Sequence, residues 1–199
     1  MLLGYNTNGF AHHGLFEAIA LLAEIGYRSV AITIDHGALS PREDWRRQLR
    51  RLKSNLEDYG MRSVIETGAR FVLSPDHKHE PSLVSATLDQ RVRRLEFYMH
   101  AVRCAAELGS DCVSLWSGTL RQPIPPGEAM TRLASDLGDL ANYAAASGVA
   151  LGFEPEPGML IDSMARFQEL LALVDAPNLK LTLDVGHLQC QGETPIAEQ

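Results

Sequence analysis

Two short apolar segments in the second half of the chain each end on a carboxylate. Residues 149–153 stop at Glu154, within Gly-Phe-Glu-Pro-Glu-Pro-Gly, and residues 179–183 stop at Asp184, three residues before His187. Parallel strands bring their C-terminal ends to one edge of a sheet, so these side chains are expected to share a site. Carboxylate oxygens and an imidazole suit a divalent metal ion. We therefore expect Glu154, Asp184 and His187 to share a site that suits a divalent metal ion.

Four further residues are candidates for substrate contacts. Glu66 and Trp116 each end a predicted strand, Glu156 follows Glu154 by two residues, and His12 lies in the first polar loop. Carboxylates accept hydrogen bonds from hydroxyl groups, and an aromatic ring can form the wall of a sugar site. Each candidate also has a plainer interpretation: core packing for Trp116, and a structural or solvent-exposed position for the others.

The metal-binding candidates have alternatives too. Glu154 as a surface acid is one, although the proline on either side of Glu156 stiffens this segment. Asp184 as a helix cap is another, although no helix pattern follows it at once. The pair His77 and His79 resembles a metal-binding His-x-His, but it lies in a long loop bounded by prolines. We expect that loop pair to be exposed to solvent.

The chain must place these residues, and it does so by repeating one unit: an amphipathic helix, a glycine, a short apolar strand and a polar loop. Five helices alternate with six strands, which are expected at 2–6, 29–34, 62–65, 112–116, 149–153 and 179–183. Strands buried on both faces and joined by helical crossovers form a parallel sheet. The second helix is predicted to open at residues 40–43, where Ser40 and Glu43 could form a capping box.

Two α/β architectures fit this alternation, a closed (β/α)8 barrel and an open doubly wound sheet. No glycine-rich phosphate loop follows the first strand, and polar residues stand at almost every strand end, as in barrel enzymes. We therefore predict a parallel TIM-type barrel with about six of its eight β/α units, in one partial domain over residues 1–199. No further strand or helix pattern is expected after His187.

Composition narrows the functional classes. The 199 residues carry a formal net charge of −7 with no basic block, which argues against a nucleic-acid partner. The three cysteines show no CxxC spacing, so a reducing compartment fits. No apolar run approaches the roughly 20 residues that span a bilayer, and the N-terminus shows no signal pattern. We expect a cytoplasmic protein with no membrane contact.

The stretches 152–158 and 181–187, Gly-Phe-Glu-Pro-Glu-Pro-Gly and Leu-Thr-Leu-Asp-Val-Gly-His, resemble the fifth and sixth strands of one enzyme family. This is the sugar phosphate isomerase/epimerase family of xylose isomerase-like TIM barrels. It also includes ketose 3-epimerases, inosose dehydratases and endonuclease-IV-like proteins. The resemblance implies a divalent metal ion, manganese, magnesium, cobalt or zinc, bound by Glu154 and Asp184, and it implies that His187 contacts the substrate or the metal. The family's later His and Glu ligands have no counterpart, because this chain stops after the sixth strand.

The resemblance also implies a reaction. A metal bound to the carbonyl and hydroxyl of a sugar makes the adjacent C–H acidic, and Glu154, as ligand and base, removes the proton to give an enediolate. The substrate would be a sugar, a sugar phosphate or a related polyol. Alternatives are a dehydratase or an endonuclease-IV-like hydrolase of the same fold, although the acidic composition disfavours the latter. A catalytically incomplete fragment or binding module is a further alternative. A homo-oligomer is compatible with the sequence.

Overall fold

The computed structural model describes residues 2–194, over which strands and helices alternate. The elements, in chain order, are β1 Gly4–Asn6, the 3₁₀ helix η1 Thr7–Phe10, α1 Leu15–Ile25, β2 Ser29–Thr33, α2 Trp45–Asp58, β3 Arg62–Glu66, α3 Leu88–Leu108, β4 Val113–Leu115, α4 Pro126–Ala146, β5 Leu151–Phe153, α5 Met164–Val174, β6 Leu179–Leu181 and α6 Val185–Gln191. No helix in this part of the chain is long and apolar enough to cross a membrane.

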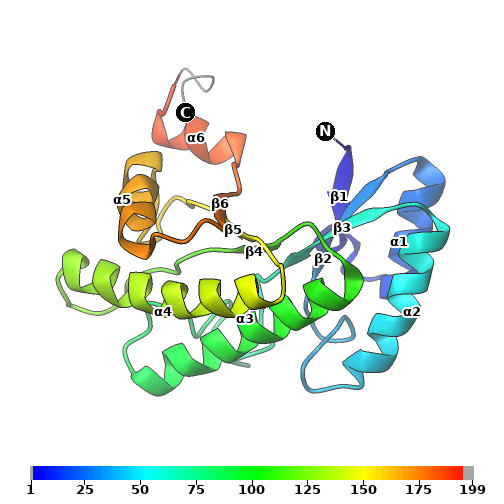
Figure 1. The fold of residues 1–199 in the computed structure, drawn as a ribbon, viewed down its shortest axis with the longest axis horizontal. Coiled ribbons are helices and arrows are strands. Elements are labelled where there is room, and N and C mark those ends of the chain that lie inside the picture. Colours follow the sequence, from blue (N-terminus) through cyan, green and yellow to red (C-terminus); the bar gives the residue numbers. More distant parts are fainter. Residues whose placement is uncertain (1, 195–199) are drawn as a thin grey trace.

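The six strands form one sheet whose spatial order, β1 to β6, is the order of the sequence. Every neighbouring pair is parallel. Figure 1 shows β1 and β6 at opposite ends of the sheet, with the helices arranged along its outside. Sequential parallel order with helical crossovers is the arrangement of a TIM barrel, whereas a doubly wound sheet reverses direction at a switch point. The predicted α/β fold, a partial barrel of six units, is therefore confirmed.

The helices pack on the sheet through the apolar stripes that the sequence shows. In α2, Leu49, Leu52 and Leu56 are buried, and the polar residues between them face outward. The long helices α3 and α4 lie side by side over the middle of the sheet (Figure 1). Burying an aliphatic side chain stabilises a fold by about 1.5–3 kcal/mol, so these stripes hold the strand ends in place.

Two predictions about helix starts are wrong. The second helix begins at Trp45, not at Ser40, because the side chain of Asp44 accepts a hydrogen bond from the backbone N–H of Arg47. The Glu43 carboxylate instead accepts from the N–H of Gly37, outside the helix. The expectation of no further helix near His187 also fails, since α6 follows β6 directly and Asp184 caps it.

Candidate metal centre

The backbone brings the ends of β4, β5 and β6 together in register. Glu154 donates its N–H to the carbonyl of Leu115 at 2.9 Å, and Thr182 donates to the carbonyl of Phe153 at 2.8 Å. Glu154 therefore lies opposite Thr182 across the sheet, and Asp184 follows two residues later in the chain. Glu154, Asp184 and His187 each offer one ligand atom, and these atoms lie within 4.8 Å of one another.

Hydrogen bonds orient the imidazole and the carboxylate of this group. Nδ1 of His187 lies 3.1 Å from the carbonyl oxygen of Pro155, which only accepts, so Nδ1 carries the proton. The lone pair is then on Nε2, which lies 3.8 Å from Oδ2 of Asp184. The other oxygen of Asp184, Oδ1, accepts the backbone N–H of His187 at 2.9 Å. A carbonyl that fixes the tautomer of a histidine is a typical neighbour of a metal ligand.

The electrostatics of the cluster favour a cation. Burial, together with the charges of Glu156, Asp184 and Glu66, raises the pKa of the Glu154 carboxyl to about 7, while His187 opposes this effect. Burial also raises the pKa of Glu156. Carboxylates that are expensive to ionise together bind a divalent ion favourably, because the ion offsets their repulsion. Two carboxylates and one imidazole nitrogen therefore fit a divalent metal by donor chemistry and by charge.

These groups border a cavity of about 280 Å³ at the C-terminal ends of the strands. The lining is mainly polar. The ends of β1 to β5 and the segments that follow them contribute residues, and His187 comes from α6, which follows β6. The lining residues are Asn6, Asn8, Thr33, Glu66, Gly68, Arg70, His79, Trp116, Glu154, Glu156, Met159 and His187. This volume is close to the lower end of ligand pockets, about 300 Å³, and suits a small polar molecule.

Five of the residues predicted from the sequence meet in this cavity: Glu66, Trp116, Glu154, Glu156 and His187. The sixth, Asp184, stands at its border within the group of ligand atoms, with its side chain 42% exposed. His12 is exposed and does not line the cavity, so its predicted substrate contact finds no support in the geometry.

Trp116 both packs in the core and lines the cavity. The residue is only 6% exposed, so it packs in the core, yet its remaining surface lines the cavity. The guanidinium of the fully buried Arg94 lies 4.5 Å from the centre of the indole ring, and the Tyr98 hydroxyl donates to the Trp116 carbonyl at 3.2 Å. Both contacts hold the aromatic wall in place.

Several residues that line the cavity were not predicted from the sequence. Thr33 has its hydroxyl within 2.8 Å of Asn6 Oδ1 and 2.9 Å of Glu66 Oε2, which ties together the ends of the first three strands. Arg70 lines the cavity, and its side chain donates a hydrogen bond at 2.6 Å to Asp35, which lies two residues after the end of β2. The prediction of a solvent-exposed loop holds for His77 but is wrong for His79, which lines the cavity.

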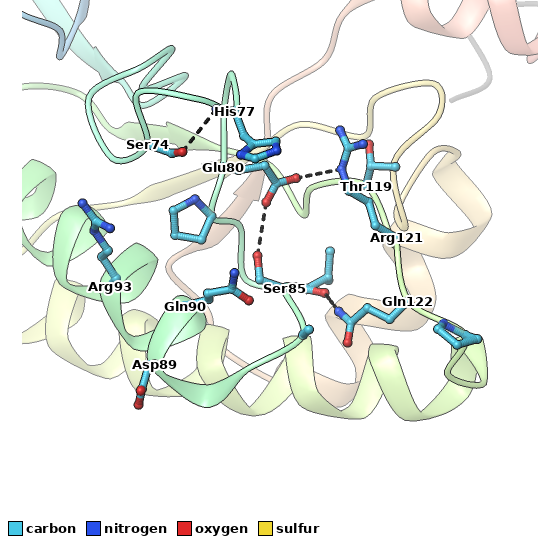
Figure 2. Close-up of a pocket in the computed structure, with 14 residues that line it drawn as sticks. Ser74, His77, Glu80, Ser85, Asp89, Gln90, Arg93, Thr119, Arg121 and Gln122 are labelled. Carbon is cyan, nitrogen blue, oxygen red and sulfur yellow. Dashed lines mark hydrogen bonds and ion pairs between the residues drawn. The ribbon is translucent and has the colours of Figure 1, made fainter.

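A larger cavity of about 630 Å³ lies between the loops that follow β3 and β4 (Figure 2). The Glu80 carboxylate joins its walls, since it pairs with Arg121 at 3.2 Å and accepts the Ser85 hydroxyl at 3.2 Å. None of the residues predicted from the sequence as site residues lines this cavity. Because its central polar groups are engaged with one another, we place the candidate chemistry in the smaller cavity.

A parallel sheet in sequential order, with acids gathered at its C-terminal edge, defines the class of TIM-barrel proteins that carry a site at the strand ends. A model of the xylose isomerase-like TIM barrel family matches residues 19–199. The chain belongs to this family. No curated protein matches the sequence.

Solved structures show the same fold at low sequence identity. L-ribulose 3-epimerase is 20% identical, with a TM-score of 0.77 over 96% of this chain and 62% of its own. D-allulose 3-epimerase from Methylomonas sp., solved with D-allulose, is 20% identical, with a TM-score of 0.79 over 100% and 67%. The IolI protein, solved with a zinc atom, is 16% identical, with a TM-score of 0.74 over 96% and 66%. The chain therefore spans about two thirds of the length of these proteins.

Proposed function

We propose that the chain carries the metal and sugar sites of a divalent-metal-dependent sugar isomerase or epimerase that works through an enediolate. The observation that carries the proposal is the convergence of Glu154, Asp184 and His187 beside a small polar cavity. Among proteins of the same fold, two are named as sugar 3-epimerases and one structure contains zinc, which supports both the substrate class and the metal.

The residues divide the chemistry between them. A divalent cation held by Glu154, Asp184 and His187 would polarise the carbonyl of a sugar as a Lewis acid. The Glu154 carboxylate accepts the proton from the carbon next to that carbonyl, and an enediolate of the sugar results. Protonation of this carbon on its opposite face by a second acid inverts it, as an epimerase does, whereas return of the proton from Glu154 to the neighbouring carbon moves the carbonyl, as an isomerase does.

The other cavity residues bind and orient the sugar in this proposal. Glu66 and Glu156 accept hydrogen bonds from hydroxyl groups, and Trp116 presents apolar surface to the sugar carbons. Glu66 is already held by the backbone N–H of Gly68 at 2.9 Å, so its carboxylate is positioned before a sugar arrives. Preorganisation of this kind lowers the entropic cost of binding.

Metal titration tests the proposal. We expect chelator-treated protein to bind manganese, measured by calorimetry, at about one ion per chain and to lose this binding in Asp184→Asn. Glu154→Gln should abolish turnover of ketohexoses such as D-allulose while the protein stays folded. Glu169→Gln is the matched control, because it makes the same change on the exposed face of α5.

Two results would contradict the proposal. Absence of manganese binding by the wild-type protein removes the metal site, and wild-type turnover in Glu154→Gln removes this residue from the mechanism. A role of His12 in substrate binding, manganese as the native ion, a cytoplasmic location and homo-oligomer formation remain predictions from the sequence alone.

A further inference from the structure

His79 is held in an unusual and well-defined conformation at the wall of the candidate site. Its backbone φ of 67° lies in the left-handed region, which few residues other than glycine adopt. Its N–H donates to the carbonyl of Arg70 at 2.6 Å, which closes a loop of the segment that follows β3. Strained residues of this kind persist where surrounding contacts determine them, and they cluster at functional sites.

The imidazole ring of His79 is fixed as firmly as its backbone. Nδ1 lies 2.7 Å from the carbonyl oxygen of Gly68. The ring also stands edge-on to Trp116, with 5.8 Å between ring centres and an interplanar angle of 89°. Because a carbonyl oxygen only accepts, Nδ1 of the neutral ring carries the proton and Nε2 carries the lone pair. Within residues 2–194, Nε2 forms no hydrogen bond.

His79 and His77 lie on different sides of one loop. His79 lines the small cavity together with Glu154 and Glu156, whereas His77 lines the larger cavity, where its N–H donates to the Ser74 hydroxyl (Figure 2). The segment around residues 74–81 is thus a wall between the two cavities. Of the two histidines, only His79 lines the candidate sugar site, and the hydrogen bond of its Nδ1 to Gly68 leaves Nε2 as its acceptor nitrogen.

We propose that Nε2 of His79 accepts a hydrogen bond from a hydroxyl of the bound sugar and that this contact selects for sugars with a hydroxyl at that place. The inference rests on the proposed function. The carboxylates of the cavity are acceptors that also attract the cation, whereas His79, like the amide of Asn8, accepts without negative charge. With Trp116 at right angles to it, the ring forms a corner that has one polar and one apolar face.

Histidine-to-asparagine exchange separates this role from a structural one. In His79→Asn the amide NH₂ takes the place of Nδ1–H and can still donate to Gly68, and asparagine tolerates the left-handed backbone. The exchange removes Nε2 and, with the ring, the edge contact to Trp116. His77→Asn is the matched control on the other side of the wall. Both variants would be compared with the wild type in manganese titration, in thermal unfolding, and in binding and turnover of D-allulose by the manganese-loaded protein.

We expect His79→Asn to raise both the Kd and the KM for D-allulose about tenfold, the effect of one lost neutral hydrogen bond, with kcat, manganese affinity and the unfolding temperature unchanged. His77→Asn should match the wild type in every measurement. Unchanged Kd and KM in His79→Asn overturn the inference and leave the proposed function standing. Loss of manganese binding or of thermal stability in His79→Asn overturns it as well, in favour of a structural role. A wild-type protein that binds neither manganese nor a ketohexose overturns the proposed function and this inference together.

Discussion

Replacing Glu154 by glutamine is expected to stabilise the metal-free protein at alkaline pH, although the same change should remove the proposed metal binding. Burial and the charge of Glu156 raise the pKa of the Glu154 carboxyl from 4.5 to about 7. In the unfolded chain the carboxyl titrates at its ordinary value. The folded state therefore holds this proton more tightly than the unfolded state, and ionisation of Glu154 acts against folding.

The sign and size of the effect follow from these two pKa values. The stability associated with the protonated carboxyl is fully present below pH 4.5 and is lost as the pH rises through about 7. The full difference corresponds to about 3 kcal/mol at pH 8. The Glu154 side chain is 22% exposed, so partial hydration reduces the expected effect to about 2 kcal/mol. Glutamine has nearly the same shape and no charge, and it should escape this loss.

The assay is urea denaturation of both proteins, followed by circular dichroism in the presence of a chelator, from pH 4.5 to pH 8. The free energy of unfolding of Glu154→Gln should exceed that of the wild type by a margin that grows from near zero at pH 4.5 to about 2 kcal/mol at pH 8. Glu169→Gln, on the exposed face of α5, should track the wild type throughout. If Glu154→Gln also tracks the wild type, the Glu154 carboxylate is well hydrated and the electrostatic argument for a cation site is wrong.

Three further predictions follow from the same geometry. Asp184→Ala and Asp184→Asn should both lose manganese binding, but Ala should cost about 1 kcal/mol more in the free energy of unfolding, measured in urea, because Asn can still cap α6. Gly118→Ala should destabilise the fold by about 3 kcal/mol in the same assay, since its φ is 92° and an added Cβ would lie 2.3 Å from Cβ of Ser82; an unchanged midpoint would contradict this packing. Manganese affinity should fall about tenfold per pH unit below pH 7, with about one proton released per ion, because the raised pKa of Glu154 makes protons compete with the metal; calorimetry in two buffers of different ionisation enthalpy measures that release.

The fold could be predicted from the sequence because its information is local and repeated. Apolar stripes of period 3.6 mark the helices, and short apolar runs mark strands that are buried on both faces. Topology then follows, since helical crossovers between adjacent strands leave little choice but parallel sequential order. The same reasoning predicts that Glu66, Trp116 and Glu154 lie at one edge of the sheet, because a residue at the end of a parallel strand lies beside the ends of the neighbouring strands.

The loop residues of the site could not be predicted in this way. His79 reaches the cavity because its N–H bonds to Arg70 and its ring bonds to Gly68, contacts that span nine and eleven residues of irregular chain. No periodicity encodes such a path, and the composition of the loop indicates only an exposed segment. The prediction of where α2 starts was wrong for a related reason. Both Ser40 and Asp44 are good caps, and the choice between them depends on where Glu43 finds its partner.

Asp184 shows why a cap and a ligand need not be competing interpretations of one acid. A carboxylate has two oxygens, and here Oδ1 accepts the His187 N–H while Oδ2 lies 3.8 Å from His187 Nε2. The cap places His187 in the first turn of α6, three residues on, which brings its ring back over the carboxylate that caps the helix. The start of α6 and the candidate ligand pair Asp184 and His187 thus form one local structure. A short Asp-x-x-His at the end of a parallel strand therefore indicates both at once, and the absence of a longer helix pattern after it is no argument against the cap.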